Sequence, residues 1–411
     1  MHHKASLIVQ PGDSFFPIVH AIDRAERTIN LTIFRMDDPI IHKALVEAQK
    51  RRVRIRLLIS SSARGWEEKN QKLLKDAKKE GIATKEPSAD SKSARYHYKV
   101  MTVDDSYAMI FTFNPTRENL HYTRDFGVEL YDPAVAGEIN RLFDADWDDI
   151  EFTPDPESPL LISPFNSRQK MTDLLSSAET SIHIIDAKLE DPAIIKLLVE
   201  KAKSGVEVRV LGDAKDGVNL PAEIEWRTVP RFKLHAKCTI VDGQRAVLGS
   251  MNLRTQSMDR RREVCIRLED EDIVRRLNAV FKSDWEHKPP ASSTAATQLG
   301  GIFEEAPIAP TLEAGTGLVL ISRRDALVRH PLKHEATTIG RADENEIVVL
   351  DLRASRHHAR INVDKKTCSI TDLGSANGTF VNGERIEGTH KIKPGDVIDI
   401  AGADEFRLIE L

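Results

Sequence analysis

Two stretches of the chain, YHYKVMTVDDSYAMIFTFN at 96–114 and LHAKCTIVDGQRAVLGSMN at 234–252, share one spacing of polar residues. In each, a histidine is followed by a lysine, an aspartate and an asparagine at the same intervals. One such pattern alone would carry little meaning. Two copies at identical spacing indicate a duplicated unit, and they decide how the rest of the chain is interpreted.

The repeat extends well beyond these stretches. Residues 25–58 match 178–211 without a gap, and residues 97–147 match 235–285. In the first copy, TINLTIFRM and VRIRLLI predict strands, and DPIIHKALVEAQKR predicts a helix that begins at Asp-Pro. This alternation predicts two α/β units, 1–152 and 153–287, whose mixed sheets are covered by helices.

The composition changes after the second unit. Residues 288–317 are rich in Pro, Ala, Ser, Thr and Gly, which predicts a flexible linker. Residues 318–411 contain short apolar runs separated by turn residues, which predicts a small all-β sandwich.

Charge and cysteine content narrow the function classes. A formal net charge of -5 argues against a nucleic-acid coat, although basic residues outnumber acidic ones between residues 43 and 99. The 3 cysteines lack disulfide and metal-ligand spacing, which favours the cytoplasm. No apolar run is long enough to span a bilayer, so we expect a soluble protein whose membrane contact, if any, is peripheral.

The repeated stretch carries a set of groups suited to phosphate chemistry. Residues two apart in a strand share a face, so His97 lies on the same side as Lys99. If the hairpin loop is 105–106, His97 lies opposite Asn114 and Lys99 lies opposite Thr112. The second copy repeats this arrangement with His235, Lys237, Ser250 and Asn252 around a loop at 243–244.

A carboxylate follows each asparagine by eleven residues, Asp125 in the first copy and Glu263 in the second. It can accept a proton from one imidazole nitrogen and leave the other free as a nucleophile or an acid. Two histidines then suffice for phosphodiester chemistry without a metal. One attacks phosphorus, the other protonates the leaving oxygen, and lysine and asparagine stabilise the charge.

HYKVMTVD and HAKCTIVD match the H-x-K-x4-D signature of the phospholipase D superfamily, and GSMN matches its G-S-x-N continuation. The resemblance covers about residues 5–287. It implies a pseudo-symmetric pair of α/β/α units, a phosphohistidine intermediate and no cofactor. The N-terminal histidine of such pairs is often the nucleophile, which would be His97, but the symmetry of the sequence leaves His235 open as the alternative. Asp104 and Asp242 are then structural, and Phe111 departs from the pattern. The predicted catalytic set is His97, Lys99, Asn114, Asp125, His235, Lys237, Ser250, Asn252 and Glu263.

The substrate has three interpretations. The stretch from Asn252 to Ser257 is similar to cardiolipin-synthase-like members, so phospholipid is the favoured phosphodiester. The basic region 43–99 supports the alternative, a nuclease acting on DNA or RNA. The third is a scaffold that binds phosphate without cutting it. The sequence leaves open whether water or an alcohol accepts the phosphoryl group.

The C-terminal segments IGRADENEIVV, SRHHARI and DLGSANGTFVNGERI resemble a forkhead-associated (FHA) domain over 318–411. The resemblance implies a sandwich that binds a phosphothreonine-containing protein. His358 and Gly378 are expected to be structural. Ala376 stands where the family often has a hydroxyl residue. The predicted phosphopeptide-binding residues are Arg341, Ser355, Arg356, Ser375 and Asn377.

Overall fold

The structure is a computed structural model of the chain. The described residues are 4–11, 13, 15–59, 63, 65–86, 96–212, 220–228, 233–286, 318–322, 329–332, 336–342, 345–349, 353–364, 367–402 and 404–410. The chain divides into two compact units, 1–292 and 293–411, which are described separately. The predicted linker 288–317 and much of the loop that leads into His97 lie outside the described residues.

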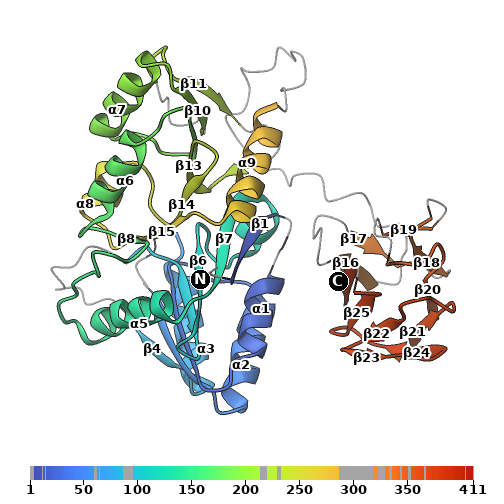
Figure 1. Ribbon diagram of the computed structural model, residues 1–411. Coiled ribbons are helices and arrows are strands. Elements are labelled where there is room, and N and C mark those ends of the chain that lie inside the picture. Colours follow the sequence, from blue (N-terminus) through green and yellow to red (C-terminus); the bar gives the residue numbers. More distant parts are fainter. Residues whose placement is uncertain are drawn as a thin grey trace, which may run out of the picture. The chain divides into compact units, whose positions relative to one another are not determined.

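The first half of the N-terminal unit has a mixed sheet with strand order β1-β7-β6-β5-β2-β3-β4 (Figure 1). Its strands are β1 (Lys4–Gln10), β2 (Thr28–Ile33), β3 (Arg54–Ile59), β4 (Ala83–Lys85), β5 (Val100–Val103), β6 (Tyr107–Phe111) and β7 (Thr123–Tyr131). Its helices are α1 (Phe16–Asp23), α2 (Pro39–Lys50), α3 (Glu67–Lys79), α4 (Arg117–His121) and α5 (Pro133–Asp148).

The second half repeats this plan with strand order β11-β10-β9-β13-β14-β15-β8. Its strands are β8 (Leu160–Ile162), β9 (Ser181–Asp186), β10 (Glu207–Gly212), β11 (Glu225–Thr228), β12 (Lys233–Leu234), β13 (Lys237–Val241), β14 (Arg245–Gly249) and β15 (Val264–Leu268). Its helices are α6 (Ser167–Ser176), α7 (Pro192–Lys203), α8 (Thr255–Asp259) and α9 (Glu271–Glu286). The predicted duplicated α/β fold is therefore confirmed.

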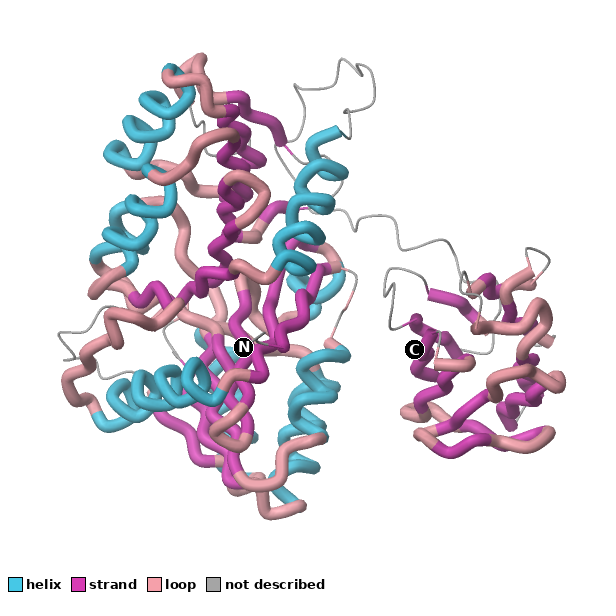
Figure 2. The backbone as a smooth tube through the Cα atoms, in the orientation of Figure 1, coloured by secondary structure: helices cyan, strands magenta, loops and turns pink. Residues whose placement is uncertain are grey.

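Three apolar clusters divide this unit into layers, with helices on both sides of each sheet (Figure 2). The outer face of the first sheet packs on α1, α2 and α3 through Ile22, Leu45 and Leu74. The outer face of the second packs on α6 and α7. The inner faces of both sheets share one cluster with α5 and α9, which contains Phe143 and Phe281. The two halves therefore fold around a common core, as sheets with one apolar face require.

The Asp-Pro signal marks a helix start in both halves, as predicted. The Asp38 carboxylate accepts the N–H groups of residues 40 and 41, and Pro39 opens α2. Asp191 and Pro192 do the same for α7. Proline has no N–H to lose at this position, and the aspartate satisfies donors that the helix leaves unpaired.

The predicted hairpin register is wrong by one residue. Val103 pairs with Tyr107, so the loop between β5 and β6 has three residues rather than two. Asp104, the first residue of this loop, has a φ of 51° in the left-handed region, and its carboxylate accepts backbone N–H groups of residues 26–28. The second hairpin behaves identically, with Val241 paired to Arg245. The histidines are therefore not directly opposite the asparagines.

Phe111, the departure from the family pattern, is accommodated by a compensating exchange. Phe111 pairs with Gly127 on β7, whereas the second half has Gly249 on β14 paired with Cys265 on β15. A Cβ on Gly249 would lie 2.3 Å from the carbonyl oxygen of Val264. Each half therefore keeps one glycine in this cross-strand pair, on opposite strands.

The C-terminal unit is a sandwich of two sheets, ordered β17-β16-β26-β25-β22-β23 and β19-β18-β20-β21-β24. They enclose an apolar core that includes Leu320, Ile361, Ile370, Ile398 and Phe406. The strands are β16 (Leu318–Ser322), β17 (Arg329–Pro331), β18 (Thr337–Gly340), β19 (Ile347–Val348), β20 (Ala359–Asp364), β21 (Thr367–Asp372), β22 (Thr379–Val381), β23 (Glu384–Arg385), β24 (Thr389–Ile392), β25 (Val397–Ile400) and β26 (Asp404–Glu410). The predicted all-β sandwich is confirmed.

Replacing Gly127 with valine should destabilise the N-terminal unit by about 1–3 kcal/mol, because even a Cβ there lies 3.0 Å from the Phe111 ring. Urea unfolding followed by tryptophan fluorescence measures this unit alone, since all 4 tryptophans precede residue 286. Gly137→Ala is the control, because a Cβ there meets nothing within 4 Å. An unchanged midpoint for Gly127→Val would contradict the packing argument.

Candidate active site

Each histidine motif is hydrogen-bonded to the other half of the unit. Tyr96 forms a parallel bridge with Arg262, whose carbonyl accepts the His97 N–H at 2.9 Å. Symmetrically, β12 pairs with β7, and the carbonyl of Arg124 accepts the N–H of Ala236 at 2.9 Å. The two motifs therefore lie along the junction between the halves.

The carboxylates also cross this junction. Nδ1 of His97 lies 3.0 Å from the Glu263 carboxylate, and Nδ1 of His235 lies 3.0 Å from that of Asp125. An ionised carboxylate can only accept here, so Nδ1 carries the proton and Nε2 keeps its lone pair. The carboxylates are buried, whereas the imidazoles are 18% and 30% exposed. Each half thus orients the histidine of the other.

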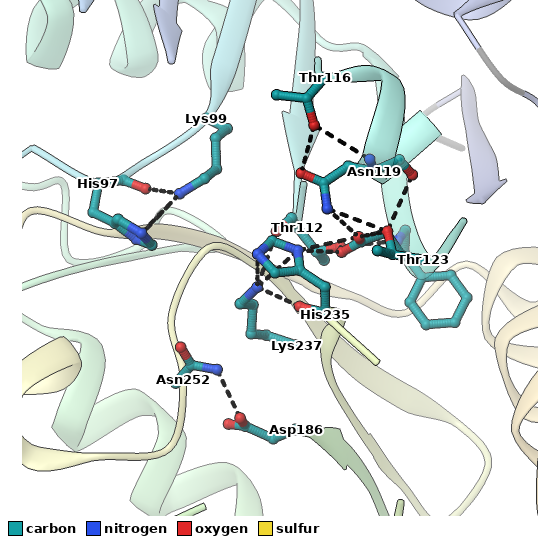
Figure 3. A network of polar contacts seen from close by, with 12 residues as sticks. His97, Lys99, Thr112, Thr116, Asn119, Thr123, Asp186, His235, Lys237 and Asn252 are labelled. Carbon is teal, nitrogen blue, oxygen red and sulfur yellow. Dashed lines mark hydrogen bonds and ion pairs between the residues drawn. The ribbon is translucent and has the colours of Figure 1, made fainter. Parts of the chain in front are cut away.

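A buried lysine lies against each imidazole (Figure 3). Nζ of Lys99 is 3.1 Å from Nδ1 and 3.4 Å from Nε2 of His97, and Nζ of Lys237 is 3.3 Å from Nδ1 and 3.2 Å from Nε2 of His235. Each ammonium also donates to the carbonyl of its own histidine. Burial lowers the pKa of Lys99 to about 7 and also lowers the pKa of Lys237.

Burial sets the charge state of the site. It lowers the pKa of His97 to about 3, against the opposing effect of Glu263, and it lowers the pKa of His235 in the same way. Burial acts to raise the pKa of Asp125, but His235 and Lys237 outweigh it and the pKa is lowered. The site at neutral pH therefore holds neutral imidazoles against ionised carboxylates.

The two hydroxyls predicted to face the pocket instead brace the carboxylate strands. Thr112 donates to Asp125 at 2.6 Å and accepts the N–H of Phe126. Ser250 accepts the N–H of Val264 at 3.1 Å and is fully buried. The prediction placed Ser250 among groups that face substrate, and the structure corrects this, because the hydroxyls turn toward the neighbouring strand.

Asp125 has further partners that the sequence did not reveal. Thr123 donates to its second carboxylate oxygen at 2.6 Å, and Asn119 on α4 lies within 3.5 Å of the same oxygen (Figure 3). Thr116 caps α4 and bonds to Asn119. This network fixes the carboxylate that holds His235.

The two motif asparagines have unequal surroundings. Oδ1 of Asn114 accepts the N–H groups of Phe34 and Arg35 at 3.2 and 3.1 Å. Nδ2 of Asn252 donates to Asp186 at 2.7 Å, as Figure 3 shows. The repeat places Ile33 at the position equivalent to Asp186, so comparing the copies could not reveal this partner. Both asparagines therefore hold the chain at the end of a central strand.

The motif aspartates lie away from the imidazoles. Asp104 accepts the N–H groups of residues 26–28, and Asp242 accepts those of residues 179–181. Each thereby ties its hairpin to the start of a central strand. Burial opposes ionisation of Asp242, but these N–H donors prevail and lower its pKa to about 2.

Two reciprocal ion pairs lock the halves together. Arg124 makes a two-pronged contact with Asp284 on α9 at 2.6 and 3.0 Å. Arg262 contacts Asp146 on α5 at 3.1 and 3.0 Å. All four side chains are buried. Sequence reasoning missed them, although both copies place arginine before the carboxylate and aspartate before a tryptophan.

In the C-terminal unit, the predicted phosphopeptide-binding residues gather at neighbouring loops. The N–H of Arg341 donates to the carbonyl of Ser355, and the Ser355 hydroxyl accepts the N–H of Ala376 at 3.0 Å. Asn377 donates to the carbonyl of Arg353 at 2.8 Å, and Arg356 is exposed. The three loops that carry these residues are thus bonded to one another.

Three further residues shape these loops from within. Buried His358 accepts the N–H of Ser355 and bonds to the carbonyl of Gly378, which has a φ of 85°. Ser375 donates to Asp372 and accepts the N–H of Gly378. Ser375 is predicted from the sequence to face the ligand. The structure instead places it inside the turn, where it is buried.

The comparison with protein families decides the affiliation. The family model described as "Cardiolipin synthase, PLD-like domain" matches residues 18–147 and 171–285, which is more than half of the chain. The chain belongs to this family. The FHA domain model matches residues 337–401, so the chain also carries an FHA domain.

Several known proteins are similar to part of this chain in sequence or in fold. The ABC transporter ATP-binding/permease protein Rv1747 of Mycobacterium tuberculosis is 32% identical over 129 residues, 31% of this chain and 13% of the transporter. Polyphosphate kinase of Porphyromonas gingivalis has a TM-score of 0.56 at 17% identity, over 71% of this chain and 53% of the kinase. Phosphatidylserine synthase of Haemophilus influenzae has a TM-score of 0.55 at 12% identity, over 69% and 87%. Both structures share the fold of the part of this chain that they cover.

Across the part of the chain that the structure describes, no helix is both long enough and apolar enough to cross a membrane.

Replacing Arg262 with methionine should destabilise the N-terminal unit by about 3–5 kcal/mol, because Asp146 is left buried without its partner. Burial already raises the pKa of Asp146 to about 6, and loss of Arg262 raises it further. The carboxyl is then protonated at pH 5 but penalised as an anion at pH 8. The decrease in the free energy of unfolding should therefore be larger at pH 8 than at pH 5, and urea unfolding at both pH values measures it.

Arg56→Met is the matched control for this prediction. Arg56 pairs with Asp144 within one half, and that carboxylate is 51% exposed, so water solvates it when the arginine is removed. The loss should be smaller and the same at both pH values. If Arg262→Met lowers the stability equally at both pH values, the buried Asp146 carboxylate is not the source of the effect.

Proposed function

We propose that the N-terminal unit transfers a phosphoryl group from a phosphodiester through a phosphohistidine on His97. The observation that carries the proposal is the crossed pair of dyads, His97 with Glu263 and His235 with Asp125. In each, the carboxylate fixes the proton on Nδ1, so Nε2 is the reactive nitrogen. Family membership supports the same reaction class.

In the first step, Nε2 of His97 attacks phosphorus, forming a P–N bond as the P–O bond to the leaving group breaks. His235, protonated at Nε2, gives that proton to the leaving oxygen. In the second step, His235 removes a proton from water or an alcohol, which attacks phosphorus as the P–N bond breaks. Lys99 and Lys237 stabilise the charge on the non-bridging oxygens in both steps.

His97 suits the attack because its low pKa keeps the imidazole neutral. The general acid must instead hold a proton. The negative charge of a bound phosphodiester favours the protonated form of His235, which Asp125 also stabilises. Charge stabilisation comes from side chains of the chain, so this mechanism needs no metal ion.

Phospholipid is our favoured substrate class, and its support is the cardiolipin-synthase-type family model. The Asn252–Ser257 stretch adds less than its sequence indicated, because Ser257 is buried and bonds to Arg254. Turnover of phosphatidylglycerol vesicles and of single-stranded DNA should be compared in chelator. Cleavage of DNA without lipid turnover would make the chain a nuclease instead.

We further propose that the FHA domain binds phosphothreonine through Arg341, Ser355, Arg356 and Asn377, to recruit a phosphoprotein or to be regulated by one. The family model supports this role, and the bonded loops keep these side chains together. A planar guanidinium and a hydroxyl are both suited to phosphate oxygens.

The phosphohistidine can be trapped in a His235→Asn variant. With bis(p-nitrophenyl) phosphate the leaving group needs no protonation, so His97 should still be phosphorylated, while hydrolysis slows by about 100-fold or more without its base. Intact-protein mass spectrometry should show an acid-labile adduct that His97→Ala abolishes. An adduct in His97→Ala would assign attack to His235. No adduct in either variant would refute the covalent step.

Phosphopeptide binding should be lost selectively. Arg341→Ala and Ser355→Ala should each weaken binding of a phosphothreonine peptide by about 10- to 100-fold, because each removes a charge-assisted contact worth about 1.5–3 kcal/mol. Arg360→Ala, an exposed arginine on β20, is the control. Isothermal titration with phosphorylated and unphosphorylated peptides measures the effect. Equal affinity for the two peptides would contradict the assignment.

A further inference from the structure

An aromatic and cationic cluster flanks His97 in the first half. The Phe34 ring lies 5.0 Å from the His97 ring, centroid to centroid. The guanidinium carbon of Arg35 is 5.6 Å from the Phe34 ring and 5.4 Å from the Trp66 ring. One aromatic ring therefore separates an arginine from the proposed nucleophile.

The cluster is fixed to the catalytic motif. Asn114 accepts the backbone N–H groups of Phe34 and Arg35, and the Phe34 carbonyl accepts a hydrogen bond from Asn70 on α3 at 2.9 Å. Lys69 lies over the other part of the cluster, 4.3 Å from the Trp66 ring. The position of Arg35 thus follows from the geometry of the motif and is not that of a free surface side chain.

The second half has different residues at the positions equivalent to this cluster. The repeat places Ala187 and Lys188 at the positions of Phe34 and Arg35. There Asp186 accepts the N–H of Lys188 at 2.7 Å and binds Asn252. The reactive groups of the two halves are thus nearly two-fold, whereas the described residues that flank them differ. The aromatic-backed guanidinium lies on the His97 flank.

Cations and carboxylates both surround the reactive groups, and Glu263 opposes the cations by acting to raise the pKa of Lys99. Arg35, Arg261 and Lys237 all act to lower the pKa of Lys99, and Lys188 acts similarly on Lys237. The Arg35 guanidinium is half-buried, and this burial lowers its own pKa. The carboxylates of Glu118 and Glu67 oppose this effect and act to raise the pKa of Arg35. A single phosphodiester carries only one negative charge.

We propose that Arg35, backed by Phe34 and Trp66, binds a second anionic group of the substrate beside the reacting phosphodiester. The substrate class is then a phosphodiester with another phosphate or carboxylate within a few bonds. A planar guanidinium stacked on aromatic rings is pre-organised for two-pronged binding of such a group. The location of the reacting phosphate rests on the function proposed above, whereas binding by Arg35 can be measured without turnover.

Isothermal titration of the full chain with inorganic phosphate and with pyrophosphate tests the subsite. Every protein carries Arg341→Ala, which removes the proposed anion site of the FHA domain. Pyrophosphate should bind about 10- to 100-fold more tightly than phosphate, because it adds a charge-assisted contact to Arg35. Arg35→Gln should abolish this preference, and Arg35→Lys should keep part of it. Lys188→Gln is the matched control on the other flank and should retain the preference.

Several outcomes overturn the proposal. If Arg35→Gln weakens phosphate and pyrophosphate by the same factor, Arg35 contacts only the reacting phosphate. Equal affinity for the two anions, or no measurable pyrophosphate binding, also refutes it. Tryptophan fluorescence unfolding shows whether each variant is folded. Should phosphodiester turnover be absent while Arg35→Gln still abolishes the preference, the proposed function fails and the subsite stands.

Discussion

The candidate active site depends on two adjacent residues in each half, an arginine and a carboxylate, which lie at or just before the start of a strand. The arginine binds an aspartate of the opposite half, and its carbonyl accepts the N–H of the opposite histidine motif. The carboxylate beside it holds the imidazole of that motif. Packing of the halves and assembly of the site are therefore the same event, and neither half alone contains an oriented histidine.

Burial at this junction explains the electrostatics. Water is kept from Lys99, Lys237, Asp125 and Glu263, so desolvation is the largest influence on their pKa values. Such groups are stable only because opposite charges, backbone carbonyls and hydroxyl donors contact them. The result is a polar cluster fixed before substrate arrives, which is the condition for strong electrostatic stabilisation of charge during reaction.

Because the unit is duplicated, both halves carry the same reactive residues. The positions at which the two copies differ make the surroundings of the two histidines unequal. In the first half Phe111 pairs with Gly127, and in the second half Gly249 pairs with Cys265. Each half therefore has one glycine in this cross-strand pair, although the glycine is on a different strand. Asp186 has an apolar equivalent in the first half, Ile33, and Arg35 is replaced by Lys188 in the second half. The two equivalent motifs thus lie in unequal surroundings, which suits the different roles that we propose for the two histidines.

The sequence by itself determined the duplicated α/β units, the C-terminal sandwich, the Asp-Pro helix starts and the histidine, lysine and carboxylate set, because periodicity and exact spacing are local properties. Only the tertiary structure decided which carboxylate meets which histidine, that Ser250 and Ser375 point inward, and that the hairpins have three-residue loops. Crossed pairs such as Arg262 with Asp146 join residues more than a hundred positions apart. Spacing along a chain cannot encode which of two identical halves a side chain will contact, because that choice is made when both faces pack into one core.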